Sequence, residues 1–193
     1  MEISILTPPG QSGAFTIGRR EQRRSLEDLP KRHLKLLDEP ITAGMSCVNG
    51  NGTIHTSPVW VSRDQAEILL NSVRGRQKDR NLRLRRHVSL LFMDPADPYH
   101  WMAIQGVVVK IVDEDDPIHG NMATESINAM SQSYLGKSTY PLRDPAGGEV
   151  RSLYRCGQTE RRCLGTPKGM MRPECNLSVP QQIRTGQPAR WDS

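Results

Sequence analysis

The stretch NSVRGRQKDRNL, residues 71–82, decides how this chain is interpreted. It follows the apolar run Ile-Leu-Leu at 68–70, which is typical of a strand end. Arg74, Arg76 and Lys78 then lie close together in a short turn that leads into a predicted helix. Such a turn presents free backbone N–H groups and the positive end of a helix dipole, and Gly75 lets the backbone approach a ligand closely. The order favours a phosphate-binding turn, the alternative being a solvated run of charges on a surface helix.

The positive charge of the chain is concentrated in this region. Seven basic residues and one acidic residue lie between Arg74 and Arg86, whereas all 193 residues together carry a net charge of only +5. The rest of the chain is therefore close to neutral. One cationic site on a balanced body suits a phosphate group better than a long polyanion. An aromatic content of 5% argues further against a nucleic-acid binder.

Composition divides the chain into three parts. Residues 1–24 contain Pro-Pro-Gly at 8–10 and scattered polar residues, and we expect a flexible leader there. Residues 25–155 carry the apolar patterns and form the predicted domain. Residues 156–193 hold Gly, Pro, Arg and Gln without the period of a helix or a strand, so we expect an irregular tail.

Short strands separated by turn signals dominate the predicted domain. The sequence Asn-Gly-Asn-Gly at 49–52 predicts a hairpin turn, because Asn and Gly tolerate positive φ. Pro58 cannot donate to a strand ladder and predicts an edge strand or a bulge. Gly106 breaks the pattern of a long strand and predicts a bulge or a barrel bend there. The expected strands are 41–48, 53–62, 67–73, 87–93, 99–113 and one from 150, and the expected helices are one from Ser25 to 37, one from the basic turn to 86, and 118–135.

Many short antiparallel strands with helices added late predict a β-barrel with peripheral helices, an α+β architecture. A sheet this short buries a limited core. A second copy of the chain would add burial for the apolar side chains of the long strand, so we expect a dimer. The side chains concerned are Trp101, Met102, Ile104, Val107 and Val109.

No constellation for hydrolysis or metal binding stands out. The five histidines are scattered, and the four cysteines form no CxxC pair, so we expect no metal site and assign no catalytic residue. No run approaches the roughly 20 apolar residues of a membrane span, and the chain opens without the apolar core of a signal peptide. We expect a cytoplasmic, reducing location.

Several segments, in this order, resemble the split-barrel flavin- and deazaflavin-binding family known from pyridoxamine 5′-phosphate oxidase, and most of all its branch that uses coenzyme F420. The resemblance runs from about 37 to 154. Its landmarks are Gly52 with SPVW at 57–60, RGRxKxxNL at 74–82, IQG at 104–106, YLGK at 134–137 and EVR at 149–151. The contacts to pyridoxal phosphate expected of a true pyridoxamine oxidase are not found, so we do not expect vitamin B6 oxidation.

This resemblance implies a six-stranded antiparallel split barrel of the FMN-binding type. It also implies a homodimer with two cofactor sites at the subunit interface. In such proteins the basic turn holds the cofactor phosphate, the strand matching 56–59 lies along the ring, and the partner contributes from the region matching 98–101. The implied cofactor-binding residues are Thr56, Ser57, Pro58, Val59, Asn71, Ser72, Val73, Arg74, Arg76, Lys78, Asp79, Asn81, Pro98, Tyr99 and Trp101.

The resemblance implies an F420-dependent oxidoreductase that transfers a hydride between reduced deazaflavin and a conjugated small-molecule acceptor. Deazaflavin carries its hydride on C5, so the protein has only to orient ring and substrate, exclude water and set the local field. An FMN-dependent oxidoreductase of the same fold is the close alternative. Alternatives of another class are a non-catalytic flavin- or F420-binding protein and a basic nucleic-acid binder acting through residues 74–86. The sequence leaves the substrate open.

Overall fold

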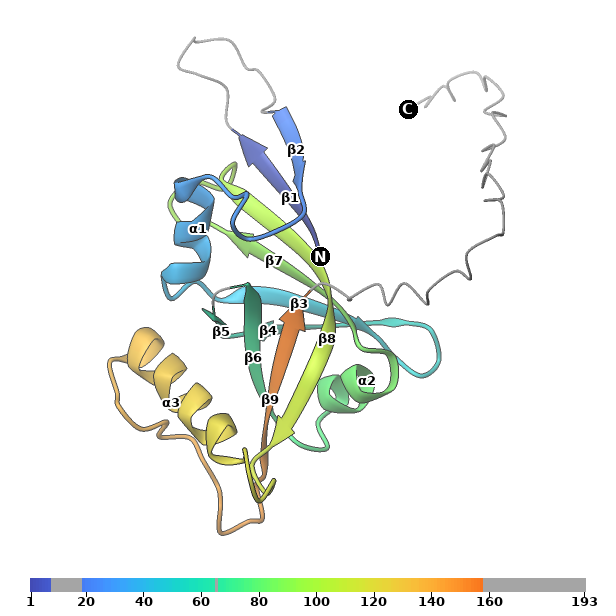
Figure 1. The fold of residues 1–193 in the computed structure, drawn as a ribbon, viewed down its shortest axis with the longest axis vertical. Coiled ribbons are helices and arrows are strands. Elements are labelled where there is room, and N and C mark those ends of the chain that lie inside the picture. Colours follow the sequence, from blue (N-terminus) through green and yellow to red (C-terminus); the bar gives the residue numbers. More distant parts are fainter. Residues whose placement is uncertain (8–18, 65, 158–193) are drawn as a thin grey trace, which may run out of the picture. The chain divides into compact units, whose positions relative to one another are not determined.

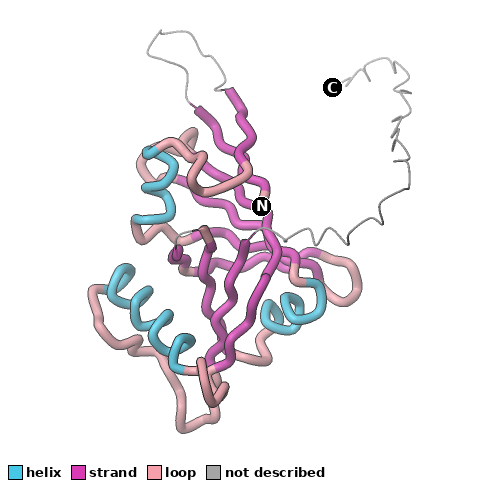
Figure 2. Tube along the Cα trace, viewed as in Figure 1, coloured by secondary structure: helices cyan, strands magenta, loops and turns pink. Residues whose placement is uncertain are grey.

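The computed structural model describes residues 1–7, 19–64 and 66–157, which form a curled antiparallel sheet with helices on its outside (Figures 1 and 2). This agrees with the expected barrel with peripheral helices. The sheet has nine strands, where six were expected. The described strands are β1 (Glu2–Thr7), β2 (Arg19–Arg23), β3 (Ala43–Val48), β4 (Ile54–Val59), β5 (Val61–Asp64), β6 (Glu67–Val73), β7 (His87–Met93), β8 (Trp101–Asp113) and β9 (Arg151–Gly157), and the helices are α1 (Lys31–Asp38), α2 (Gln77–Arg85) and α3 (Asn121–Leu135).

The strands follow the order β4-β3-β7-β8-β9-β6-β5, and the β1–β2 hairpin joins at β8. Strand β8 is long enough to pair with three other strands. Its first part pairs with β1 and β7, and its second part pairs with β9. The apolar side chains that alternate along the strands fill the inside of the curl, among them Leu70, Phe92, Ile104 and Tyr154, each at most 2% exposed. Each such side chain contributes about 1.5–3 kcal/mol to stability by leaving water.

Local signals fix several element ends. Gly52 has a φ of +87°, and Asn49 N–H donates to Thr53 O at 2.8 Å, so the hairpin predicted at 49–52 is confirmed. Gly136, with a φ of +68°, ends α3 as a left-handed cap. Helix α1 begins at Lys31 and not at Ser25, because Pro30 occupies the N-cap. Ser25 Oγ instead accepts a hydrogen bond from Asp28 N–H in the preceding turn.

Pro58 lies in β4, which ends the sheet, so the edge strand that it predicts is confirmed. The expected strand 53–62 is divided at Trp60 into β4 and β5. The bulge that was one of two alternatives at Gly106 is wrong toward β7, because Gly106 pairs regularly with Val88, whereas the alternative of a barrel bend stays a prediction. The irregularity of β8 lies farther on, where the register toward β9 shifts between Val108 and Lys110.

The flexible leader expected over 1–24 is wrong for the residues that the structure describes. Strands β1 and β2 pair with each other, and β1 pairs with β8 (Figure 1). Ile3 and Ile5 are completely buried in the core, an alternation that the sequence offers but that spans too few residues to predict a strand. The sheet thus includes residues before 25 and runs past 155 to Gly157, while the rest of the expected tail lies outside the described residues. In the described ranges no helix is long and apolar enough to span a bilayer.

Candidate functional site

The basic turn connects β6 to α2 beside the start of β9. Arg74 N–H donates to Val150 O at 2.9 Å, which ties the turn to the chain entering β9. Gly75 has a φ of +83°, a conformation that a residue with a Cβ adopts only with strain. Arg76 is then the N-cap of α2, and its side chain makes no capping hydrogen bond in the described structure. The N–H groups in the first turn of a helix have no partner within the helix and can bind an anion.

Asp79 holds the turn from inside the protein. Its carboxylate is 2% exposed and accepts hydrogen bonds from Gly75 N–H at 2.7 Å, Arg83 Nε at 2.7 Å and Tyr154 OH at 2.5 Å. Burial and the bond to this carboxylate raise the pKa of Tyr154 far above its ordinary value, so the phenol remains a proton donor. The Asp79 side chain therefore stabilises the turn and has little capacity left for a ligand.

Two arginines of the basic segment are neutralised by acids at the end of β8. Arg74 forms ion pairs with Asp115 and, at 3.2 Å, with Asp113. Arg83 pairs with Asp113 at 2.5 Å and with Asp79. The hydrogen bond to Asp115 is the main cause of the raised pKa of Arg74. Carboxylates thus occupy Arg74, which was expected to bind phosphate.

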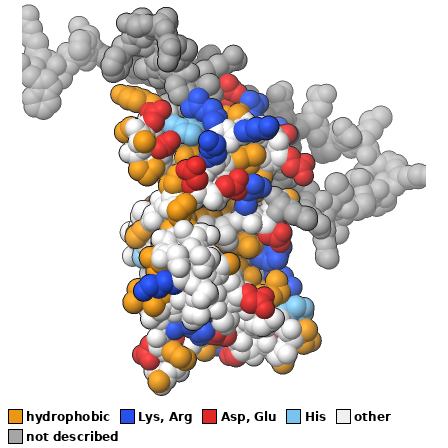
Figure 3. Space-filling view, turned by 90° about the vertical axis from the view of Figure 1, so that its left-hand side faces the viewer, with side chains coloured by type: hydrophobic (Ala, Val, Ile, Leu, Met, Phe, Trp, Pro, Cys, Tyr) orange, Lys and Arg blue, Asp and Glu red, His pale blue; other side chains and the backbone are white. Residues whose placement is uncertain are grey.

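Acidic and basic side chains are also interspersed on the face of the molecule seen in Figure 3, in line with the near-neutral charge expected outside the basic turn.

Arg76 and Lys78 instead line a cleft of about 210 Å³ between α3, the β4–β5 corner and the faces of β6 and β9. Lys78 Nζ lies 3.4 Å from Pro58 O, and among the described residues no carboxylate forms an ion pair with either cation. Burial lowers the pKa of Lys78, and the charge of Arg76 lowers it further. Such a pair of uncompensated cations attracts an anion. The cleft is lined by Thr42, Pro58, Val59, Trp60, Asn71, Arg76, Lys78, Ile127, Met130, Tyr140 and Arg151.

The polar floor of the cleft includes a hydrogen-bond acceptor that the described residues leave unused. Asn71 Nδ2 donates to Ala123 O at 2.8 Å, whereas Asn71 Oδ1 is buried and has no hydrogen-bond partner in the described structure. A buried orphan acceptor costs about 1–3 kcal/mol unless a ligand or a water donates to it. Asn71 therefore fits a ligand with an N–H or O–H group.

Aromatic side chains form one wall. Trp60 stacks on Tyr134, with ring centroids 4.9 Å apart, and meets Tyr140 edge to face at 5.7 Å. Tyr134 OH donates to Ile41 O at 2.9 Å and accepts from Val61 N–H at 3.1 Å, which fixes α3 against the β4–β5 corner. The wall is thus rigid, and a planar ligand could lie against it.

The structure brings only some of the predicted site residues together. Pro58, Val59, Asn71, Arg76 and Lys78 line the cleft, and the others do not. Ser72 and Asn81 are buried, and Asn81 forms hydrogen bonds with Gln77 and Asn49. Thr56 forms a hydrogen bond with Ser46 on the outward face, and Ser57 Oγ is buried with no hydrogen-bond partner among the described residues. The remaining predicted residues, which lie outside the lining, are Val73, Arg74, Asp79, Pro98, Tyr99 and Trp101.

Several lining residues were not predicted. Tyr140 and Arg151 come from the loop after α3 and from the start of β9, and no local motif marks either as a site residue. The only signal was the landmark EVR at 149–151, which marked the resemblance but carried no predicted role in binding.

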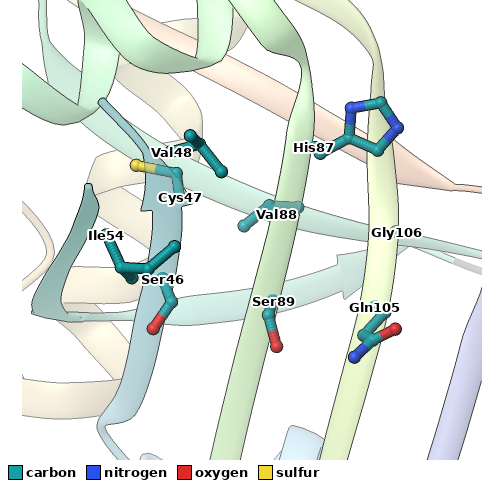
Figure 4. A pocket seen from close by; sticks show the side chains of 9 residues that line it. All are labelled: Ser46, Cys47, Val48, Ile54, His87, Val88, Ser89, Gln105 and Gly106. Carbon is teal, nitrogen blue, oxygen red and sulfur yellow. The ribbon is translucent and has the colours of Figure 1, made fainter. Parts of the chain in front are cut away.

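A second hollow, of about 220 Å³, lies on the outward face of β3, β7 and β8. Its side chains project from neighbouring strands, as Figure 4 shows for Ser46, Ser89 and Gln105. Exposed apolar side chains occur on the same face, with Ile54 63%, Leu91 44% and Met93 46% exposed. Met102 and Ile104, expected to gain burial from a second copy, are already buried in this chain's own core.

Comparison with known proteins identifies the fold. Residues 29–141, more than half of the chain, match the family model described as pyridoxamine 5′-phosphate oxidase. The chain belongs to the pyridoxamine 5′-phosphate oxidase family. The curled sheet is the split barrel of this family, as the resemblance implied.

Among solved structures, a protein described as an F420 reductase is 25% identical, with a TM-score of 0.56 over 68% of this chain and 96% of that chain. A conserved hypothetical protein from Mycobacterium tuberculosis is 18% identical, with a TM-score of 0.49 over 79% and 98% of the two chains. A FAD-binding protein from Mesorhizobium loti is 15% identical, with a TM-score of 0.47 over 70% and 93%. No protein with a curated description matches the sequence.

Proposed function

We propose that this member of the pyridoxamine 5′-phosphate oxidase family is an F420-dependent oxidoreductase that binds the phosphate of its cofactor at Arg76 and Lys78. The single observation that carries the proposal is this pair of cations without carboxylate partners in the described structure, set in a cleft at the N-terminus of α2. The similarity to the F420 reductase favours deazaflavin over FMN.

The residues present fit a cofactor of this kind. A phosphate group between Arg76 and Lys78 would also meet the uncapped N–H groups of α2. The orphan acceptor Asn71 Oδ1 would receive a hydrogen bond from a ring N–H or a side-chain hydroxyl of the cofactor. The cations and the unpaired acceptor would both be satisfied by one ligand that is anionic at one end and carries hydrogen-bond donors along its length.

The chain's own residues then orient and shield the reaction. Reduced F420, when held at Arg76 and Lys78, would supply a hydride to a conjugated acceptor and become oxidised, and a proton from solvent would complete the reduced product. Trp60 and Tyr140 offer a flat apolar surface that excludes water from one side of the cleft. Positioning and desolvation of this kind need no nucleophile from the protein.

We also propose that a second copy of the chain covers the outward face of β3, β4 and β7. Three residues that lie side by side across β4, β3 and β7 are apolar or small, because Pro58 pairs with Gly44 and Gly44 pairs with Leu91 in the strand register. Ile54 and Met93 extend the exposed apolar surface on both sides of these three residues. In this dimer the 98–101 segment of each protomer, in which Tyr99 is 60% exposed, reaches toward the cofactor of the other.

The direct test is to titrate the purified protein with F420 and, separately, with FMN and to follow the fluorescence of each. We expect micromolar or tighter binding of F420 and weaker binding of FMN. The oxidation of reduced F420 is then followed with a panel of quinones and unsaturated ketones. Tighter binding of FMN, with flavin retained through gel filtration, would show that FMN and not F420 is the cofactor. Failure to bind either one would refute the proposal.

A further inference from the structure

Arg151 is a buried cation in the lining of the same cleft, and neither the family resemblance nor the basic-turn motif gives it a role. Its side chain is 4% exposed, yet it lines the cleft with Arg76 and Lys78. It is the first residue of β9 and pairs in register with Val73, the last residue of β6 before the basic turn. The backbone thus delivers Arg151 to the base of the turn.

The guanidinium group is held in place by two neighbours. Arg151 Nε donates to Glu149 Oε1 at 2.5 Å, and its central carbon lies 4.8 Å from the ring centroid of Tyr140. Glu149 Oε2 in turn accepts a long bond, 3.3 Å, from Asp144 N–H. A cation–π contact and one ion pair fix the plane of the group, so little rotamer entropy is lost when it binds a ligand.

The terminal nitrogens of this guanidinium are left unused by the residues that the structure describes. In the described part of the chain, neither Nη1 nor Nη2 of Arg151 forms a hydrogen bond, and neither is enclosed without access to solvent. Arg155, on the same strand, shows the opposite arrangement, because Glu67 and Asp64 engage it from both sides. A guanidinium that is nearly buried but keeps its paired donors free at a cleft suits bidentate binding of an oxyanion.

We propose that Arg151 is a third phosphoryl-binding residue, which completes the site of Arg76 and Lys78 by gripping two oxygens of the cofactor phosphate. The inference rests on the proposed function for the identity of the cofactor, but not for the anion site itself. Glu149 and Tyr140 are positioning residues in this arrangement, since they act on the ligand only through Arg151.

The experiment compares ligands with and without the phosphate, for the wild type and for Arg151→Met. FMN is set against riboflavin, from which it differs only in the phosphate. F420 is set against its deazaflavin ribityl core, which lacks the phosphate together with the acidic tail attached to it. We expect Arg151→Met to weaken the phosphorylated ligand of each pair by about tenfold or more and to change the affinity for the phosphate-free ligand by less than about twofold. Arg151→Lys, which keeps the charge but loses the fork, should recover part of the affinity.

Two control variants separate binding from folding. Arg155→Met removes a cation from the same strand outside the cleft and should leave all four affinities unchanged. Arg151→Met leaves the Glu149 carboxylate buried without its partner, so the double variant Arg151→Met/Glu149→Gln supplies the comparison if the single variant does not fold. An equal loss for both members of a ligand pair, or no loss for either, overturns the proposal.

Inorganic phosphate distinguishes a failure of this inference from a failure of the proposed function. If the wild type binds no flavin or deazaflavin, the melting temperature is measured against phosphate concentration instead. A phosphate-dependent rise in the wild type that is lost in Arg151→Met supports the anion site, although the proposed function has failed. The same rise in both proteins, or none in the wild type, overturns the role of Arg151.

Discussion

Replacing Lys78 by Met tests the anion site most directly. Met keeps much of the apolar stem of Lys78 and removes only the ammonium, whose one hydrogen bond in the described structure is the 3.4 Å contact to Pro58 O. That contact is long, so we expect the free energy of unfolding to change by less than about 0.5 kcal/mol. A charge-assisted bond to phosphate contributes about 1.5–3 kcal/mol, and each 1.4 kcal/mol is a factor of ten. The affinity for F420 should therefore fall by about 10- to 150-fold, measured by fluorescence titration.

Arg74→Met is the matched control for this measurement. Arg74 lies four residues away in the same basic segment, but Asp113 and Asp115 neutralise it and it does not line the cleft. We expect its replacement to change the affinity by less than about threefold. Equal losses for Lys78→Met and Arg74→Met would show a general electrostatic attraction and refute the assignment of the cleft. Unchanged binding by Lys78→Met would refute it as well.

Three further predictions concern stability and assembly. Tyr154→Phe removes a buried donor to Asp79 and should lower the free energy of unfolding by about 1–3 kcal/mol in urea denaturation, whereas a change below about 0.3 kcal/mol would contradict the role of the bond. Burial alone would raise the pKa of Asp113, but hydrogen bonds from Arg83 and Ser152 outweigh it and hold the pKa below its usual value. The stabilisation from this ionised group is complete above the ordinary carboxyl pKa of about 4 and is lost as the pH falls through the lower pKa of the folded state. The free energy of unfolding from denaturation curves should therefore be constant from pH 7 to 5 and decrease below pH 4. A free energy of unfolding that stays constant down to pH 3 would exclude a stabilising role for the Asp113 carboxylate. Leu91→Lys should convert the dimer to monomer in sedimentation experiments, and Leu84→Lys, on an exposed position of α2, should not; dimers that persist in Leu91→Lys would place the interface elsewhere.

Local chemistry made part of this fold predictable. The turn at 49–52 and the end of α3 at Gly136 are set by residues that tolerate positive φ, and Pro58 marks an edge because it has no N–H to donate. Strand β1 was missed because its burial depends on β8, far along the chain. The two alternating isoleucines, Ile3 and Ile5, do not by themselves distinguish a strand from a leader.

The site shows the same division. Its cations could be predicted from the basic stretch, but the sequence did not indicate which of them are neutralised by carboxylates and which line the cleft. Arg74 and Arg76 differ by only two positions, and what separates them is Asp115, 41 residues from Arg74 in sequence. Arg151 joins the site through the pairing of β9 with β6, which no pattern around 151 encodes.

The shared strand β8 has a consequence for biosynthesis. Ile5 pairs with Met102, which a ribosome adds roughly 100 residues later, and the second part of β8 waits longer still for β9. Until then the nascent chain carries unpaired strand edges and two isoleucines in water, and a lone β1–β2 hairpin is only marginally stable. Closure of the sheet therefore waits until β9 has been synthesised, and until then the unpaired strand edges are open to pairing with another chain.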